Sequence, residues 1–269
     1  MQDDLTLALW QTGYTPTKAE ALQRLGVTAA QASAQGAHLL IAPEMGLTGY
    51  AIGPERVAAL AEPSDGPLAQ AVAAIAQRHG IAIVFGYPEQ NPAGKPFNAT
   101  QFIAPDGSRP MNYRKTHLFG DMDRAQFSAG DAASQVFEWR GWKLGLLICY
   151  DVEFPEAVRG LALQGADAVL VPTANMVGFD EVQNTLVPAR ACENRLYVGY
   201  ANACGSEGPT RYGGLSLVAN AQGEPLVTAG RNEALLVVAL SQDHLESARR
   251  HSQLPHRRPA LYQPLTLKE

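Results

Sequence analysis

Short apolar runs alternate with segments of helical periodicity in the first third of the chain. The apolar runs at residues 5–10, 38–42 and 81–85 have the length of buried strands. Between them, Thr17 and Pro67 each precede a segment whose apolar residues recur every three or four positions, at Leu22, Leu25, Ala29 and Ala32 in the first and at Leu68, Val72 and Ile75 in the second. The pattern predicts a β-α-β-α-β order.

The same alternation continues after a hairpin. Residues 101–104 and the turn-forming 105–107 predict this hairpin, and its second strand leads to Lys115. Helices are expected from Pro155 and over 181–194, and strands near 135–138, 143–148, 168–171, 196–201, 215–219, 226–228 and 235–240. The order predicts an α/β fold in which helix layers cover mixed parallel and antiparallel sheets.

The chain changes character after Leu240. From Ser241 onward it gains arginine and proline, including Pro255, Pro259 and Pro264, and loses periodicity. We expect residues 241–269 to form a tail that packs against another surface, such as a second subunit, and contributes no core. Since nothing resembles an interdomain linker, residues 1–269 are expected to form one domain.

Cys149 ends an apolar run and precedes a helix start. Leu144–Ile148 is too short for a helix and too apolar for an exposed strand, and Pro155 with Glu156 is typical of a first helical turn. Cys149 is therefore predicted at a strand-to-helix junction, where the helix amino terminus favours a thiolate. The alternative is a buried structural thiol.

Two further polar side chains follow predicted strands. Glu44 comes directly after the strand at 38–42 and is the candidate base, while Lys115 follows the hairpin and is the candidate cation. Each alone could be a solvated residue at the end of a strand. Three such residues at strand ends together favour a catalytic site.

Composition excludes several classes of protein. A net charge of −5 and a pI near 5.7 argue against nucleic-acid binding. The acidic first residues do not resemble a secretory signal and no apolar run is long enough to cross a membrane, so we expect a cytoplasmic protein without a membrane partner. Three cysteines without a C-x-x-C pair suit a reducing compartment, and neither a metal nor another cofactor is expected.

Three separated motifs match one known family in order and approximate spacing. They are Pro43-Glu44-Met45 with Thr48-Gly49-Tyr50, then residues 113–119 (YRKTHLF), then Cys149-Tyr150-Asp151 with Phe154-Pro155-Glu156. Together they resemble the nitrilase-type carbon-nitrogen hydrolases over about residues 5–240. The stretches 141–156, 171–176 and 189–194 look most like the bacterial amidases that act on 5-aminopentanamide (aminovaleramide) and related stereoselective amidases.

The resemblance implies a four-layered α-β-β-α sandwich, homodimers or larger homo-oligomers, and a Glu44-Lys115-Cys149 triad. Many members of the family add a second glutamate shortly after the lysine. This chain offers only Asp121 and Asp123 there, each one methylene shorter. The sequence leaves that role open between them.

The triad supplies a nucleophile, a proton carrier and a cation that stabilises an oxyanion. The expected reaction is hydrolysis of a small-molecule amide, short and aliphatic and with an ω-amino group as an option, with Lys115 and the backbone amide of Tyr150 holding the oxyanion. Ala174 and Asn175 are candidates to line the acyl pocket, although Asn175 could equally stabilise a turn. An ω-ammonium would need a partner, and the candidates Glu153, Asp180 and Glu181 could instead be helix-start residues.

Three alternatives remain open from the sequence. Nitrile hydrolysis and N-carbamoyl hydrolysis use the same three groups within this family. A non-catalytic scaffold would make the triad accidental. Cys192 and Cys204 are expected to be packing residues.

Overall fold

Two six-stranded mixed sheets form the centre of the molecule in the computed structural model, which describes residues 4–263. The first sheet has the order β14 (Ala234–Leu240), β1 (Leu5–Gln11), β2 (Leu39–Ile41), β3 (Ala82–Glu89), β4 (Phe97–Ile103) and β5 (Met111–Arg114). The second has the order β13 (Pro225–Thr228), β12 (Leu217–Ala219), β9 (Tyr197–Asn202), β8 (Ala168–Thr173), β7 (Trp142–Leu146) and β6 (Phe137–Trp139). In both sheets three consecutive strands pair in parallel, β1-β2-β3 and β7-β8-β9, and the outer pairs are antiparallel.

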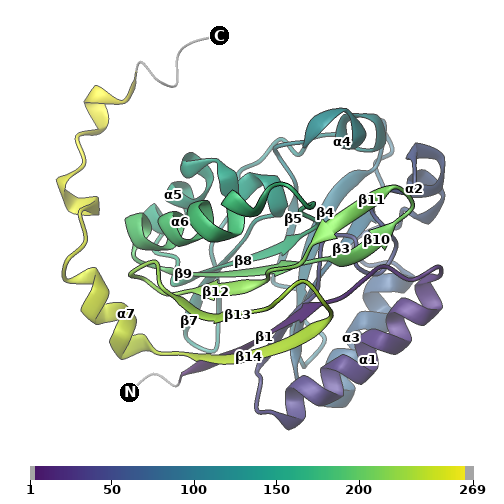
Figure 1. Cartoon of the computed structure of the whole chain (residues 1–269), viewed down its shortest axis with the longest axis horizontal. Coiled ribbons are helices and arrows are strands. Elements are labelled where there is room, and N and C mark those ends of the chain that lie inside the picture. Colours follow the sequence, from purple (N-terminus) through teal and green to yellow (C-terminus); the bar gives the residue numbers. More distant parts are fainter. Residues whose placement is uncertain (1–3, 264–269) are drawn as a thin grey trace.

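Helices cover the outer face of each sheet, which confirms the predicted α-β-β-α sandwich. Helices α1 (Lys18–Ala34) and α3 (Pro67–His79) lie outside the first sheet, and α5 (Pro155–Leu163) and α6 (Val187–Asn194) lie outside the second (Figure 1). The Thr17 hydroxyl caps α1 by accepting from the backbone N–H of Glu20, and Pro67 occupies the first turn of α3.

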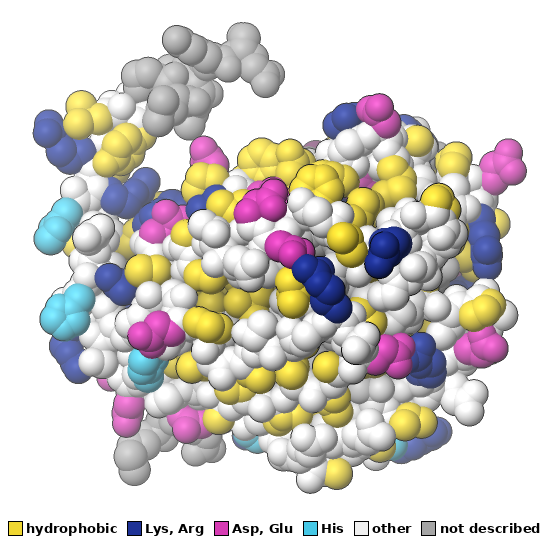
Figure 2. All heavy atoms as spheres, in the orientation of Figure 1, with side chains coloured by type: hydrophobic (Ala, Val, Ile, Leu, Met, Phe, Trp, Pro, Cys, Tyr) yellow, Lys and Arg dark blue, Asp and Glu magenta, His cyan; other side chains and the backbone are white. Residues whose placement is uncertain are grey.

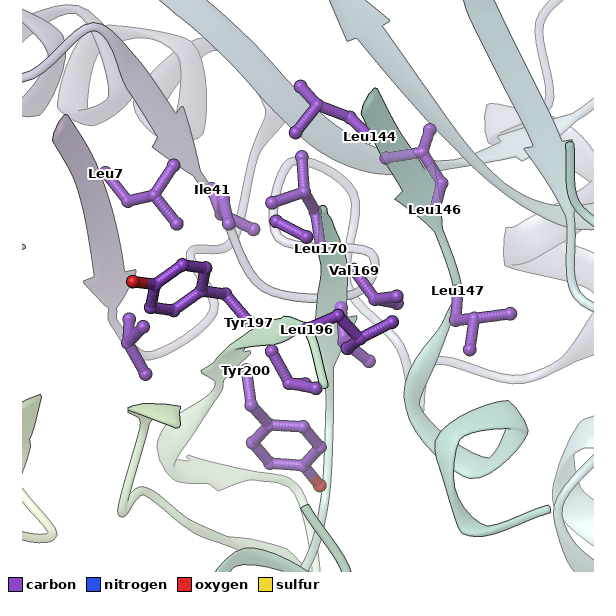
Figure 3. Packing of buried hydrophobic residues seen from close by; sticks show 14 of the residues in the cluster. Leu7, Ile41, Leu144, Leu146, Leu147, Val169, Leu170, Leu196, Tyr197 and Tyr200 are labelled. Carbon is purple, nitrogen blue, oxygen red and sulfur yellow. The ribbon is translucent and has the colours of Figure 1, made fainter. Parts of the chain in front are cut away.

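The main core lies between the two sheets. Leu7 and Ile41 from the first sheet face Leu170 and Tyr197 from the second, and all four are buried (Figure 3). Gly199 permits the close approach, since a Cβ there would lie 3.3 Å from Cδ1 of Ile41. Each such aliphatic side chain contributes roughly 1.5–3 kcal/mol by leaving water, so sheet-on-sheet packing carries much of the stability.

The structure adds elements that the hydrophobic pattern did not predict. Helices α2 (Pro54–Leu60) and α4 (Gly120–Gln126) interrupt loops, and β10 (Cys204–Glu207) pairs with β11 (Thr210–Gly213) in a separate hairpin. The helix expected over 181–194 is divided into a π-helical turn at Val182–Leu186 and α6. Pro188 explains the division, because it lacks the N–H that would continue an α-helical ladder.

The carboxyl-terminal part differs from the expected coreless tail. Helix α7 (Gln242–Arg249) buries Leu245 and Ala248 in the main core, so that expectation is wrong for this segment. Beyond it, the short turns at Leu254–His256 and Pro259–Leu261 stand out from the body of the molecule, across a groove from α5 and α6 (Figure 1). Residues 1–3 and 264–269, which include Pro264 of the expected tail, lie outside the described residues.

Charges of both signs are interspersed on the face shown in Figure 2, without a broad basic patch. Within residues 4–263, no helix combines the length and the apolar character that crossing a membrane requires.

Candidate active site

A buried lysine joins two buried carboxylates at one end of the sandwich. Nζ of Lys115 lies 2.8 Å from Oε1 of Glu44 and 2.8 Å from Oδ2 of Asp123, and all three side chains are inaccessible to solvent. The charges of all three act on the thiol of Cys149, which lines the adjoining cavity. The structure therefore brings together the three predicted residues, which come from different strand ends and different sheets.

Glu44 is fixed by close packing against the neighbouring strand. It follows β2, and Gly86 on β3 lies beneath it, where a Cβ would come within 2.5 Å of the backbone N of Met45. The side-chain amide of Asn98 donates to Oε1 of Glu44 at 2.6 Å. Oε2 is buried without a hydrogen-bond partner among the described residues, so it is the oxygen free to take a proton.

Lys115 is held through its backbone at the end of β5. Its N–H donates to the carbonyl of Asn98, and its carbonyl accepts from the N–H of Gly130, both at 2.8 Å. A Cβ at Gly130 would lie 2.5 Å from the carbonyl oxygen of Arg114, so only glycine fits against this segment. The backbone of Asn98 thus positions the lysine, while its side chain orients the glutamate.

Asp123, and not Asp121, is the second carboxylate. The Asp121 side chain is exposed and pairs with Arg124, whereas Asp123 accepts from the backbone N–H of Phe119 at 2.9 Å and from the Tyr50 hydroxyl at 2.7 Å. The shorter side chain reaches the lysine because α4 begins directly after Phe119. No pattern in the sequence separates the two aspartates, because the hydrophobic pattern does not predict α4.

Cys149 occupies a strained turn between β7 and α5. It opens a 3₁₀ turn at Cys149–Glu153 with φ of 47°, a left-handed conformation that side chains other than glycine rarely adopt. Tyr150 is the second residue of this turn, so its N–H has no acceptor within the helix and is available to an oxyanion. The order of β7, this turn and α5 confirms the predicted strand-to-helix junction at Cys149.

The expectation that the junction lowers the pKa of the thiol is wrong for the resting site. Burial and then the negative charge of Glu44 raise the pKa of Cys149 well above its usual value, while Lys115 and the backbone N–H of Ala174 act in the opposite direction. The resting cysteine is therefore a neutral thiol that needs a base. Desolvation is the largest influence on the pKa of this thiol.

The pKa values of the other two groups suit a base and a cation. Burial raises the pKa of Glu44, although the charge of Lys115 partly opposes this shift. Burial alone would lower the pKa of Lys115, but Glu44 and Asp123 outweigh it and raise the pKa well above its usual value. Lys115 therefore stays charged at neutral pH.

A buried aspartate links the lysine loop to the cysteine turn. Asp151 accepts hydrogen bonds from the hydroxyls of Tyr113 and Thr116 and from the backbone amides of His117 and Ile148, at 3.0–3.2 Å. These donors flank Lys115 on one side and Cys149 on the other. Asp151 consequently fixes the two segments relative to each other.

A small cavity opens above Cys149. The three residues predicted to contact substrate, Tyr150, Ala174 and Asn175, all line it, together with Tyr50, Phe119, Glu153 and Met176. The side-chain amide of Asn175 is committed to its own loop, donating to the Phe179 carbonyl and to the Gln183 side chain. Asn175 therefore stabilises a turn as well as forming a wall.

The three candidate partners for an ammonium group separate in the structure. Glu153 lines the cavity, Asp180 pairs with Arg231, and Glu181 is exposed. Within the described part of the chain, no group of three or more His, Cys, Asp and Glu side chains is arranged to hold a metal ion.

Comparison with known proteins supports the same chemistry. The family model for carbon-nitrogen hydrolases matches residues 6–250. The chain belongs to the carbon-nitrogen hydrolase family. It is thus a hydrolase of carbon–nitrogen bonds other than peptide bonds.

The relatives of this carbon-nitrogen hydrolase include amidases. It is 50% identical to a protein named "Hydrolase in pqqF 5'region" from Pseudomonas protegens over 97% of this chain and 92% of that one, and 39% identical to an (R)-stereoselective amidase from Pseudomonas sp. over 79% and 76%. A mutant of a nitrilase-superfamily amidase from Nesterenkonia sp. AN1, solved with butyramide, is 34% identical with a TM-score of 0.83 and covers 98% of this chain and 97% of its own. Another structure of that amidase, with a TM-score of 0.85, shows covalent addition of the acetamide moiety of fluoroacetamide at its active site cysteine.

Two residues beside this hydrolase's candidate site, Asn98 and Glu207, were not predicted from the sequence. Asn98 lies inside β4, where the apolar pattern gives no reason to single it out. Its neighbour Ala99 pairs with Arg114 at the end of β5, so Asn98 lies next to Lys115. Glu207 of the unexpected β10–β11 hairpin accepts from the backbone N–H groups of Tyr50 and Ala51, and so holds the loop that carries Tyr50. Its strands are four residues long and largely polar, which leaves no apolar pattern to detect.

Proposed function

We propose that this hydrolase is an amidase that converts a short aliphatic carboxamide into its acid and ammonia through a thioester on Cys149. The observation that carries the proposal is the free, buried Oε2 of Glu44 beside a neutral thiol and a fixed ammonium. Relatives named as amidases, one of them solved with butyramide, support the substrate class. An ω-amino group on the amide, as in 5-aminopentanamide, belongs to the proposal.

In the first half of the reaction, Sγ attacks the carbonyl carbon while Oε2 of Glu44 accepts the thiol proton. The carbonyl oxygen becomes an oxyanion, held by Nζ of Lys115 and the backbone N–H of Tyr150. When the tetrahedral intermediate collapses, the carbon–nitrogen bond breaks and Glu44 returns the proton to the departing ammonia. An acyl thioester remains on Cys149.

In the second half, water replaces ammonia. Glu44 accepts a proton from the water as its oxygen attacks the thioester carbonyl, and the same two donors hold the new oxyanion. Collapse then breaks the carbon–sulfur bond, and the sulfur regains its proton from Glu44. The carboxylic acid leaves and the resting site is restored.

A trapping experiment tests the proposal. The protein is mixed briefly with butyramide, quenched in acid and digested, and mass spectrometry locates the added acyl group, while ammonia release is measured in parallel. We expect a butyryl group on the peptide containing Cys149 and none on those containing Cys192 or Cys204. Butyronitrile and N-carbamoyl-β-alanine serve as the comparison substrates for the two alternative activities.

A Lys115→Ala variant separates catalysis from folding. Loss of one oxyanion donor typically lowers turnover by about 10²–10³-fold, so we expect that loss with an unchanged circular dichroism spectrum. Turnover of amides at the wild-type rate by this variant would overturn the role of Lys115. Turnover of the nitrile or the carbamoyl compound alone would overturn the amidase assignment.

We also propose that the protein acts in the cytoplasm as a homodimer or larger homo-oligomer. All three cysteines are free, which suits a reducing compartment. Leu261 and Tyr262 are exposed on the segment beyond α7, beside a groove lined by Pro155, Arg159 and Glu193. A second copy that packs on this face would cover them.

A further inference from the structure

Glu153 is the one charged side chain, among the described residues, that lines the cavity of Cys149. It is the last residue of the 3₁₀ turn that begins with the nucleophile. Its carboxylate has no hydrogen bond and no ion pair within the described part of the chain, although its side chain is half-buried. A partly desolvated carboxylate without a partner is costly unless something else satisfies it.

The neighbouring cations are already engaged. The ammonium of Lys115 makes its two short ion pairs with Glu44 and Asp123, and none with Glu153. The guanidinium of Arg190 donates to the backbone carbonyls of Val152 and Glu153 and pairs with Glu193. Burial, and next the charge of Glu181, raise the pKa of Glu153, as expected for a carboxylate that lacks a close counter-charge.

The other walls of the cavity suit the same kind of group. Tyr50, Phe119 and Tyr150 contribute aromatic rings, and the rings of Phe119 and Tyr150 meet edge to face at 5.3 Å. Aromatic faces attract cations, with about 0.5–2 kcal/mol per contact depending on desolvation. A carboxylate beside aromatic walls therefore favours an ammonium group and repels an anion.

We propose that Glu153 is a specificity-determining residue that binds a cationic group on the acyl part of the substrate and excludes amides that carry a carboxylate. This inference rests on the proposed amidase function and deepens it, because it assigns the charge of the substrate to one side chain. The proposed preference for a cationic substrate would distinguish this chain from relatives such as a protein named 2-oxoglutaramate amidase, whose substrate carries a carboxylate.

Matched amides test the inference by turnover. The cationic probes are 3-aminopropanamide and 5-aminopentanamide, the neutral ones of equal length are butyramide and hexanamide, and the anionic ones are succinamate and adipamate. We expect kcat/KM to favour a cationic amide over its neutral match by about 10–100-fold, as one charged hydrogen bond implies, and the anionic amide to be the poorest. Glu153→Gln should remove this preference.

Glu138→Gln provides a control of equal charge change, since Glu138 is exposed on β6 and does not line the cavity. We expect it to keep the wild-type ratio. Equal or better turnover of the neutral or anionic amides by the wild-type protein would overturn the inference, and so would an unchanged ratio in Glu153→Gln.

Binding distinguishes this inference from the amidase function itself. In a Cys149→Ala background, calorimetry with the same six amides reports affinity without any turnover. A cationic preference that disappears on adding Glu153→Gln supports the role of Glu153 even if no amide is hydrolysed. Turnover of butyramide with no cationic preference in binding leaves the amidase function intact and refutes the role of Glu153.

Discussion

In the proposed mechanism, the two oxygens of Glu44 have different roles. Oε1 accepts from Lys115 and Asn98, which keeps the side chain in place, and Oε2 is left free for the proton. Because the base must be ionised to accept the thiol proton, kcat/KM should fall as the pH drops through the raised pKa of Glu44. The acid limb of the pH profile, where kcat/KM falls, should therefore lie at a higher pH than the usual pKa of a glutamate.

Two substitutions should move that limb in opposite directions. The hydrogen bond from Asn98 lowers the pKa of Glu44, so Asn98→Ala should shift the limb to higher pH. The charge of Asp123 raises the pKa of Glu44, so Asp123→Asn should shift the limb to lower pH. Profiles of kcat/KM against pH check both, and shifts of the same sign would contradict the assignment of Glu44 as the base.

Asp151 does not line the cavity of Cys149 but joins the two segments that carry Lys115 and Cys149. Replacing it by asparagine leaves an acceptor oxygen but turns an NH₂ group toward buried donors, among them the Tyr113 hydroxyl and the backbone amide of Ile148. We expect Asp151→Asn to lower the free energy of unfolding by about 2–4 kcal/mol, since each hydrogen bond to a charged group contributes about 1.5–3 kcal/mol. Urea denaturation measures the loss.

The exposed Asp121 provides the matched control for Asp151. Asp121→Asn should change the free energy of unfolding by less than about 0.5 kcal/mol, as surface substitutions usually do. If both variants unfolded at the same urea concentration, Asp151 would not join the two loops energetically.

Among the elements, β3 sets the position of Glu44, the proposed base. Gly86→Ala would place a Cβ 2.5 Å from the backbone N of Met45, and backbone cannot yield as a flexible side chain can. The Glu44 turn must then move, and a displacement near 1 Å can cost about 10²-fold in rate. We expect Gly86→Ala to lower kcat by that factor.

Gly26→Ala in α1 is the control. Its Cβ meets nothing within 4 Å, so the variant should retain activity and gain about 1 kcal/mol of stability. Full activity of Gly86→Ala would show that the turn adapts.

Helices and strands could be predicted where the residues of the element itself carry the pattern. Strands such as β8 and β9 are buried on both faces and so read as continuous apolar runs, and α1 has a capping residue and a regular apolar face. The hairpin of β10 and β11 has neither property, because its partly exposed strands are fixed by contacts with distant loops. That Glu44, Lys115 and Cys149 come together could be predicted from strand ends. The choice of Asp123, the orientation by Asn98 and the raised pKa of Cys149 depend on which side chains become neighbours.

At the scale of the whole molecule, the site exists only where the two sheets meet. Glu44 and Lys115 follow strands of the first sheet, while Cys149 and Ala174 follow strands of the second. Their relative positions therefore depend on the core between the sheets and on hydrogen bonds across it, such as that from the N–H of Glu44 to the carbonyl of Thr173 at 3.3 Å. A substitution that removes a large side chain from this core should therefore lower the activity before it changes the secondary structure.

The segment beyond α7 tests the proposed assembly. Apart from a bond from the N–H of Ser252 to the carbonyl of Arg249, the hydrogen bonds of residues 252–262 join residues of this segment. The segment lies across a groove from α5 and α6, with Leu261 and Tyr262 exposed (Figure 1). A chain ending at Arg250 keeps the buried Leu245 and Ala248 of α7, so it should fold. We expect light scattering to give the mass of a dimer or larger assembly for the full chain and a smaller mass for the truncated one.

Leu261→Ser with Tyr262→Ser should also weaken association while leaving the segment in place, since burial of these two side chains in an interface is worth a few kcal/mol. If the truncated chain and the double variant both kept the mass of the full chain, the subunits would associate through another face.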